Sequence, residues 1–287
     1  MLNAQYFILK SHIIHDWLEG IMAIRKEYKA PFELHIEIAE SINRRNFANF
    51  HIVTLSCLID YAKKQGALVY LRIDDKDLRG YIFNDVRIRQ YWKENKDEVF
   101  STPEKQPFNL WRIEEKYYTN YSIALNQFFS QAYFAGKDLS GLHSCVVELF
   151  QNIIDHSESK GNAFFAIAYD QRKTQIDIAI CDFGVGIPYT LRSQYKDQRE
   201  ALQRSLIPGV SARTKSHNMG YGMDNIVSTM APLDIIRIVS NKAFLIKSKS
   251  KEYVFPMPYD FMGTLIYFTI STDSFEELEI IDELNFG

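Results

Sequence analysis

Three side chains that could act on a ligand recur one helical turn apart within residues 142–156: Glu148, Asn152 and His156. A spacing of four residues stacks them along one face of a helix. A carboxylate there can take a proton from an attacking nucleophile, and an amide oxygen can bind Mg²⁺. The pattern therefore predicts a general base at Glu148 and a metal contact at Asn152. A solvated polar helix face is the alternative.

A second candidate group follows an alternating apolar stretch at 175–181, where Asp182 precedes Gly184 and Gly186. A buried carboxylate at the end of a strand suits an exocyclic amino group such as that of adenine. Glycines at this spacing let the backbone approach a ligand closely. The alternative is an ordinary turn that ends a strand.

A third group combines glycines with positive charge. Gly220 and Gly222 lead into a candidate helix at 224–230, and free N–H groups at a helix start can bind an anion. Between residues 187 and 221 the chain has six basic and two acidic side chains, a local net charge of +4, against −3 for the whole chain. Arg213 and Lys215 are the best candidates for phosphate contacts. A surface loop with solvated charges is the alternative.

Taken in order, these groups and the later pair Gly263-Thr264 form a recognisable series. The series from 117 to 272 resembles the GHKL superfamily of ATPases, which includes gyrase-type topoisomerases, the large heat-shock chaperone, histidine kinases and mismatch-repair proteins. The stretch 147–157, Val-Glu-Leu-Phe-Gln-Asn-Ile-Ile-Asp-His-Ser, is most similar to the first motif of anti-sigma-factor serine kinases and histidine kinases.

The resemblance implies a role for each group. Glu148 would be the catalytic base, and Asn152 would hold Mg²⁺ that bridges the phosphates of ATP. Asp182 would accept a hydrogen bond from the adenine amino group, with Thr264 supporting the same interaction. The remaining expected ATP contacts are glycines and bases: Gly184 and Gly186 at the adenine pocket, and Arg213, Lys215, Gly220 and Gly222 in a lid over the phosphates.

The elements that would position these residues follow from apolar periodicity. We expect helices at 13–28, 46–64, 81–95, 117–135 and 142–156. We expect strands at 32–38, 67–73, 163–169, 175–181 and 264–270, and a hairpin of 234–240 with 244–250 around Asn241-Lys242.

These elements predict an α/β fold in two parts. Residues 1–115 form a small α/β regulatory or interaction domain, and residues 116–272 an ATP-binding domain. For the second part the resemblance implies a two-layer α/β sandwich of the histidine-kinase-like type. By element order alone the first part resembles a STAS domain, and an unrelated small α/β domain is the alternative. Residues 273–287 form an acidic tail with no basic residue.

Composition limits the class of protein. Hydrophobic residues are 46% and charged residues 24% of the chain, which is typical of a globular protein. Near-neutral charge argues against a general nucleic-acid or membrane-surface binder. The three cysteines, Cys57, Cys145 and Cys181, lie in apolar surroundings and indicate reduced core residues. With no basic, apolar leader at the start, we expect a cytoplasmic protein.

Three functions remain open. The first is a Mg²⁺-ATP-binding regulatory protein that hydrolyses ATP slowly and switches a protein partner through its N-terminal domain or its lid, with homodimer formation possible in principle. The second is an anti-sigma-type protein serine/threonine kinase. The third is an ATP-sensing adaptor without catalysis.

Overall fold

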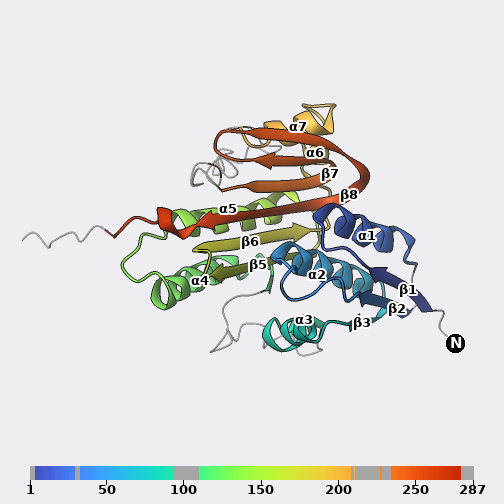
Figure 1. The fold of residues 1–287 in the computed structure, drawn as a ribbon. Helices are drawn as coiled ribbons and strands as arrows, with labels where there is room; N and C mark the ends of the chain where they lie inside the picture. Colours follow the sequence, from blue (N-terminus) through green and yellow to red (C-terminus); the bar gives the residue numbers. More distant parts are fainter. Residues whose placement is uncertain are drawn as a thin grey trace, which may run out of the picture.

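The computed structural model describes residues 4–29, 33–92, 110–207, 210, 227 and 234–278. Within these residues the protein is a mixed α/β structure with one parallel and one antiparallel sheet (Figure 1). This arrangement confirms the predicted α/β class.

The parallel sheet is formed by the N-terminal segment. Its strands are β1 (Ala4–Leu9), β2 (Glu33–Ile38) and β3 (Leu68–Ile73), paired in the order β1-β2-β3. Helices α1 (Ile14–Glu27) and α2 (Asn49–Lys64) connect them. Parallel neighbours require such crossover helices. Strand β1 was not predicted, whereas β2, β3, α1 and α2 lie within three residues of the predicted bounds.

The antiparallel sheet has the order β4-β5-β6-β8-β7. Its strands are β4 (Trp111–Arg112), β5 (Ala163–Asp170), β6 (Gln175–Asp182), β7 (Ile236–Lys247) and β8 (Glu252–Ser271). Helices α4 (Tyr118–Ala132) and α5 (Ser140–His156) precede β5, and the short helices α6 (Ile187–Thr190) and α7 (Gln198–Arg204) follow β6.

Helices cover both faces of the antiparallel sheet. On β5, Phe165 and Ile167 belong to a core shared with α4 and α5, while Phe164 and Ala166 belong to a core shared with α1 and α2. Alternate residues of a strand point to opposite faces, so both sets become buried. Figure 1 shows α1 and α2 on the side of this sheet opposite α5.

The N-terminal segment therefore shares a core with the residues after it. Helices α1 and α2 lie between the two sheets, and Cys181 and Phe183 of the second segment belong to the same apolar core as Trp17 and Leu58. Within residues 1–115, β4 pairs with β5 and is part of the antiparallel sheet. The structure thus has four layers: parallel sheet, α1 with α2, antiparallel sheet, and α4 with α5.

The hairpin predicted around Asn241-Lys242 is wrong. Strand β7 continues through these residues and turns back after Lys247 to pair with β8. Asn241 has a φ of 48° and lies where the β7–β8 register shifts. Asparagine tolerates this left-handed conformation, and here it forms a bulge within a strand and not the end of one.

The helix predicted for 81–95 is also wrong as a single α-helix. After α3 (Lys76–Gly80), the described chain forms a π-helical turn (Tyr81–Asp85) and a 3-10 turn (Ile88–Trp92). Arg87 between them has a φ of 53°, which interrupts a right-handed helix.

The described start of the acidic tail is attached to the protein. Backbone N–H groups of Asp138 and Leu278 donate to Glu276 and Gly136 at 2.9 and 2.8 Å. Lys137 and Glu277 form an ion pair at 2.6 Å. All three cysteines are buried and unpaired, as predicted. No helix in the described ranges has the length and apolarity needed to cross a membrane.

Candidate functional site

The candidate site is centred on Asp182, the last residue of β6. In the sheet Asp182 lies opposite Ala163 on β5 and Thr264 on β8. Its carboxylate accepts a hydrogen bond from the backbone N–H of Gly184 at 2.7 Å, and the backbone N–H of Thr264 also donates to it. Burial raises the pKa of Asp182 from 3.8 to about 7, and these hydrogen bonds and Arg25 oppose that rise. The carboxyl group can therefore change protonation near neutral pH.

Asp182 exposes only 1% of its surface. Contact between a ligand and this carboxyl group therefore requires displacement of an atom that now covers it. Accepting one or two N–H bonds leaves lone pairs on the carboxylate, so a further donor could be accommodated chemically.

The glycines beside Asp182 allow two backbone segments to touch. A Cβ atom on Gly184 would lie 1.8 Å from the carbonyl oxygen of Ser157, and one on Gly263 would lie 2.0 Å from the carbonyl oxygen of Asp182. Gly263 also has a φ of 132°, which side chains disfavour. At Gly184 and Gly263 the absence of a side chain is thus already required by backbone packing.

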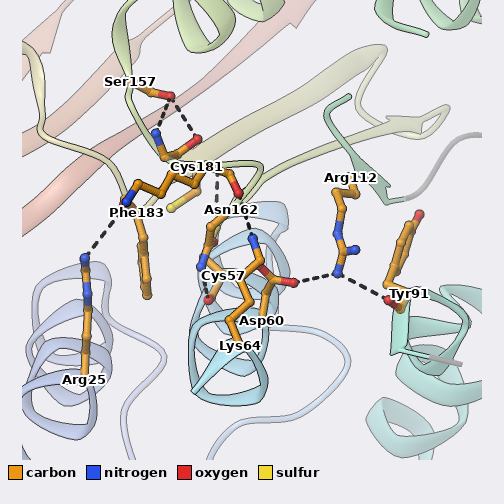
Figure 2. A network of polar contacts seen from close by, with 12 residues as sticks. Arg25, Cys57, Asp60, Lys64, Tyr91, Arg112, Ser157, Asn162, Cys181 and Phe183 are labelled. Atoms are coloured by element: carbon orange, nitrogen blue, oxygen red, sulfur yellow. Dashed lines mark hydrogen bonds and ion pairs between the residues drawn. The ribbon is translucent and has the colours of Figure 1, made fainter. Parts of the chain in front are cut away.

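The C-terminal end of α5 is attached to the turn that follows Asp182. Ser157, the residue that caps α5, accepts a hydrogen bond from the N–H of Val185 at 2.8 Å. The N–H of Phe183 donates to Asn162 at 3.1 Å, and the side chain of Asn162 donates to Cys57 on α2 at 3.0 Å (Figure 2). The helix with Glu148 and Asn152 is therefore anchored next to the Asp182 turn.

Glu148 and Asn152 project from α5 at partly buried positions. Their helix is held by an apolar stripe in the predicted register: Leu142, Val146, Leu149, Phe150 and Ile153. The amide nitrogen of Asn152 is buried and has no hydrogen-bond partner in the described part of the chain. Burial raises the pKa of the Glu148 carboxyl above its usual range. The unpaired N–H donor of Asn152 could be completed by an acceptor oxygen of a ligand.

The metal-binding atoms near Asn152 fit a magnesium ion that is bound mainly through the phosphates of a ligand. Among the described residues no group of three or more histidine, cysteine or acidic side chains could enclose a metal. Mg²⁺ commonly retains waters and binds through phosphate oxygens with few protein ligands. A single amide oxygen from Asn152 fits a metal that arrives with phosphates, and it does not fit a metal held by the protein alone.

Two polar residues of β7, Ser240 and Asn241, also belong to the site, although their sequence pattern predicts only a hairpin. The Ser240 hydroxyl lies 3.0 Å from the Thr264 hydroxyl, donates to Gly263 at 2.8 Å and accepts from Ile187 at 2.9 Å. Asn241 donates to Val185 at 3.1 Å. Together they attach the turn after Asp182 and the start of α6 to the neighbouring strands. In the sequence, the only sign that this position is unusual is the presence of an asparagine, Asn241, at the predicted turn.

Arg25 of α1 was also missed. It exposes 9% of its surface, and its guanidinium donates to the carbonyl oxygen of Phe183 at 3.4 Å (Figure 2). The guanidinium also donates to the carbonyl oxygen of Met262. The same group lies 4.3 Å from the ring centre of Phe183. Nothing in the local sequence distinguishes Arg25 from a solvated helix residue.

Four predicted site residues, Arg213, Lys215, Gly220 and Gly222, lie outside the described residues. Two of the other basic residues in the same stretch already have acidic partners. Arg199 pairs with Asp197 at 2.8 Å, and Arg204 lies 3.9 Å from Glu200. The local net charge of +4 already includes these two acids, so it comes from the four other bases: Arg192, Lys196, Arg213 and Lys215.

The described residues thus divide into two groups joined by Ser157. Asp182, Gly184, Gly186 and Thr264 lie close together around the end of β6 and the middle of β8, with Gly186 packed against Asn241. Glu148 and Asn152 lie on the helix whose cap bonds to that group. Comparison of the sequence with protein-family models and with curated proteins found no match.

Proposed function

We propose that this chain is a Mg²⁺-ATP-binding regulatory protein of the GHKL type that hydrolyses ATP slowly. One observation supports this most directly. A buried carboxylate at the end of a strand, Asp182, is followed by a glycine turn that bonds to the cap of a helix with an unpaired amide at Asn152. The motif order in the sequence agrees with the same arrangement.

In this proposal Asp182 recognises the base. Its ionised carboxylate accepts a hydrogen bond from an exocyclic amino group, and Thr264 holds it through a backbone N–H. A hydrogen bond to a charged group is worth about 1.5–3 kcal/mol when its loss leaves the partner unsatisfied. The α/β sandwich of the histidine-kinase-like type and the STAS-like N-terminal half are parts of the same proposal.

Glu148 and Asn152 act at the phosphate end. Asn152 binds Mg²⁺ through its amide oxygen, and the metal neutralises phosphate charge when it is bound. Glu148 takes a proton from the attacking water, a task favoured by a carboxyl whose pKa is raised toward neutral pH. Arg213, Lys215, Gly220 and Gly222 are proposed to contact the phosphates from the lid.

Isothermal titration with Mg²⁺-ATP at pH 8 tests binding. We expect the wild type to bind, and Asp182→Asn to weaken binding about tenfold or more, since about 1.4 kcal/mol corresponds to a factor of ten. Asp177→Asn, on the same strand but five residues earlier, is the matched control and should bind as the wild type does. Absence of wild-type binding would refute the proposal.

A second assay tests the chemistry. With γ-labelled ATP we expect free labelled phosphate from the wild type, and a loss of about a hundredfold or more in Glu148→Gln. Glu115→Gln, an exposed position before α4, should leave the rate unchanged. Labelled protein in place of free phosphate would favour the serine/threonine kinase, and binding with neither product would favour the adaptor.

A further inference from the structure

Arg25 joins two backbone segments that border Asp182. One acceptor, the carbonyl of Phe183, belongs to the residue directly after Asp182, and the other, the carbonyl of Met262, precedes Gly263 and Thr264. Thr264 in turn donates its N–H to the Asp182 carboxylate. A single guanidinium on α1 therefore holds the glycine turn and the β8 segment together behind this carboxyl group.

The setting of Arg25 makes its orientation specific. The guanidinium lies over the rings of Phe183 and Tyr61, 4.3 and 5.1 Å from their centres. Its Nε is buried without a hydrogen-bond partner in the described chain. A planar fork can bond two carbonyls and stack on rings at once, whereas an ammonium group cannot.

Few charged or titratable groups surround Asp182 in the described residues. Arg25 approaches from α1, Cys57 from α2 and Cys181 from its own strand, while Tyr61 of α2 lies beside Arg25. The thiols are neutral at physiological pH because burial raises their pKa values. Arg25 is thus the cation in the described structure that favours the ionised form of Asp182.

We propose that Arg25 is a positioning residue of the nucleotide site, through which α1 and the N-terminal segment control how well Asp182 binds its ligand. This inference rests on the proposed function. It explains how an N-terminal regulatory segment reaches the site, because displacement of α1 would release the turn at Phe183 and the segment at Met262. Coupling of this kind is reciprocal, so ligand binding would also change the affinity of the N-terminal segment for a partner.

Arg112 of β4 provides a matched control on the antiparallel sheet. It lies over the rings of Tyr91 and Phe164 at 5.9 and 5.3 Å, and it bonds to Asp60 and to the carbonyl of Tyr91 (Figure 2). It therefore also joins the N-terminal segment to the antiparallel sheet through a stacked guanidinium. None of its contacts involves the backbone beside Asp182.

The test compares Arg25→Met, Arg25→Lys and Arg112→Met in the full chain by titration with Mg²⁺-ATP from pH 6 to 9. We expect Arg25→Met to weaken binding about tenfold. We also expect its pH midpoint of binding to move up by about one unit, because removal of a nearby cation raises a carboxyl pKa. Arg25→Lys keeps a charge without the fork and should move the midpoint less while still weakening binding. Arg112→Met should leave both quantities at wild-type values.

Hydrogen exchange without nucleotide gives an independent readout. In Arg25→Met, residues 183–186 and 262–264 should exchange faster than in the wild type, while Arg112→Met should leave these segments unchanged. If Arg25→Met does not fold, the same comparison with Arg25→Lys decides the question. Wild-type affinity, pH midpoint and exchange in the folded Arg25 variants would overturn the inference, whereas a wild type that does not bind ATP would overturn the proposed function instead.

Discussion

Helices α2 and α5 pack on opposite faces of the same antiparallel sheet, yet their polar side chains differ in whether they have hydrogen-bond or ion-pair partners. In α2 the polar groups inside the core are bonded. Thr54 accepts from the indole of Trp17 at 2.8 Å, and Ser56 donates to the carbonyl of Ile52 at 2.7 Å. Asp60 pairs with Arg112 at 2.6 Å and with Lys64 at 2.8 Å.

In α5, no such partner among the described residues is seen for the Glu148 carboxylate or for the amide nitrogen of Asn152. The amide nitrogen of Asn152 is buried and unbonded within the described chain, and burial alone accounts for the raised pKa of Glu148. Both helices have a well-packed apolar side, so packing does not explain the difference. The bonded polar groups of α2 support its packing, and under the proposed function the unbonded groups of α5 are the ones that a ligand would complete.

The strongest test of this comparison removes one carboxylate from each helix. Asp60→Ala leaves Arg112 unpaired at a position whose side chain is only 18% exposed, and we expect a loss of about 3–5 kcal/mol in the free energy of unfolding. Glu148→Ala breaks no ion pair among the described residues and should change stability by less than about 1 kcal/mol. Urea unfolding followed by circular dichroism measures the free energy of unfolding of both variants. Equal losses in the two variants would contradict the proposed difference between α2 and α5.

The second test uses the pH dependence of stability at Asp182, between the two helices. Its pKa is about 7 in the folded protein and 3.8 in the reference state, so the unfolded chain releases its proton first. The stability that this group provides is complete below pH 4 and is lost as the pH rises through 7. The loss has an upper limit of about 4 kcal/mol.

Urea unfolding from pH 4 to pH 8 should therefore show a steeper decline in the wild type than in Asp182→Asn. Glu115→Gln, at an exposed position before α4, is the control for the loss of one carboxyl group. Parallel stability curves for wild type and Asp182→Asn would mean that Asp182 is not held in a poorly solvated environment.

A smaller effect is expected from a single hydroxyl in α2. Thr54→Val keeps the shape of a fully buried side chain but removes the acceptor for the Trp17 indole N–H. A buried donor without a partner costs about 1–3 kcal/mol. Urea unfolding should show a loss in this range, and an unchanged midpoint would mean that the Trp17 N–H finds another acceptor.

The smallest effect on stability is expected at Asn152. Asn152→Ala removes an amide that has no partner and replaces it with a better helix former, so we expect unchanged stability or a gain of up to about 0.5 kcal/mol. The same variant should lose Mg²⁺-dependent ATP binding in isothermal titration. A clear loss of stability would show that Asn152 has a structural role like that of Thr54.

Much of the fold was predictable because the relevant signals are local. The apolar stripe of α5 and the alternation in β5 and β6 placed these elements within two residues of their bounds. Strand β1 is as long as β2 and β3, but its sequence, Ala-Gln-Tyr-Phe-Ile-Leu, does not alternate between apolar and polar residues, and it is defined by its pairing with β2. The Asn241-Lys242 pair correctly indicated a left-handed backbone position at Asn241. Whether that position forms a bulge or a hairpin turn is decided by the pairing of β7 with β8.

From the sequence alone, Glu148 and Asn152 could be placed on one helix and Asp182 at the end of a strand, because helical and strand periodicity depend on neighbours in the chain. The position of Arg25 beside that carboxylate could not be foreseen. Arg25 and Phe183 are separated by 158 residues, and they meet only because α1 packs between two sheets. Such a contact depends on how distant elements bury their apolar faces against each other, a property that no local spacing records.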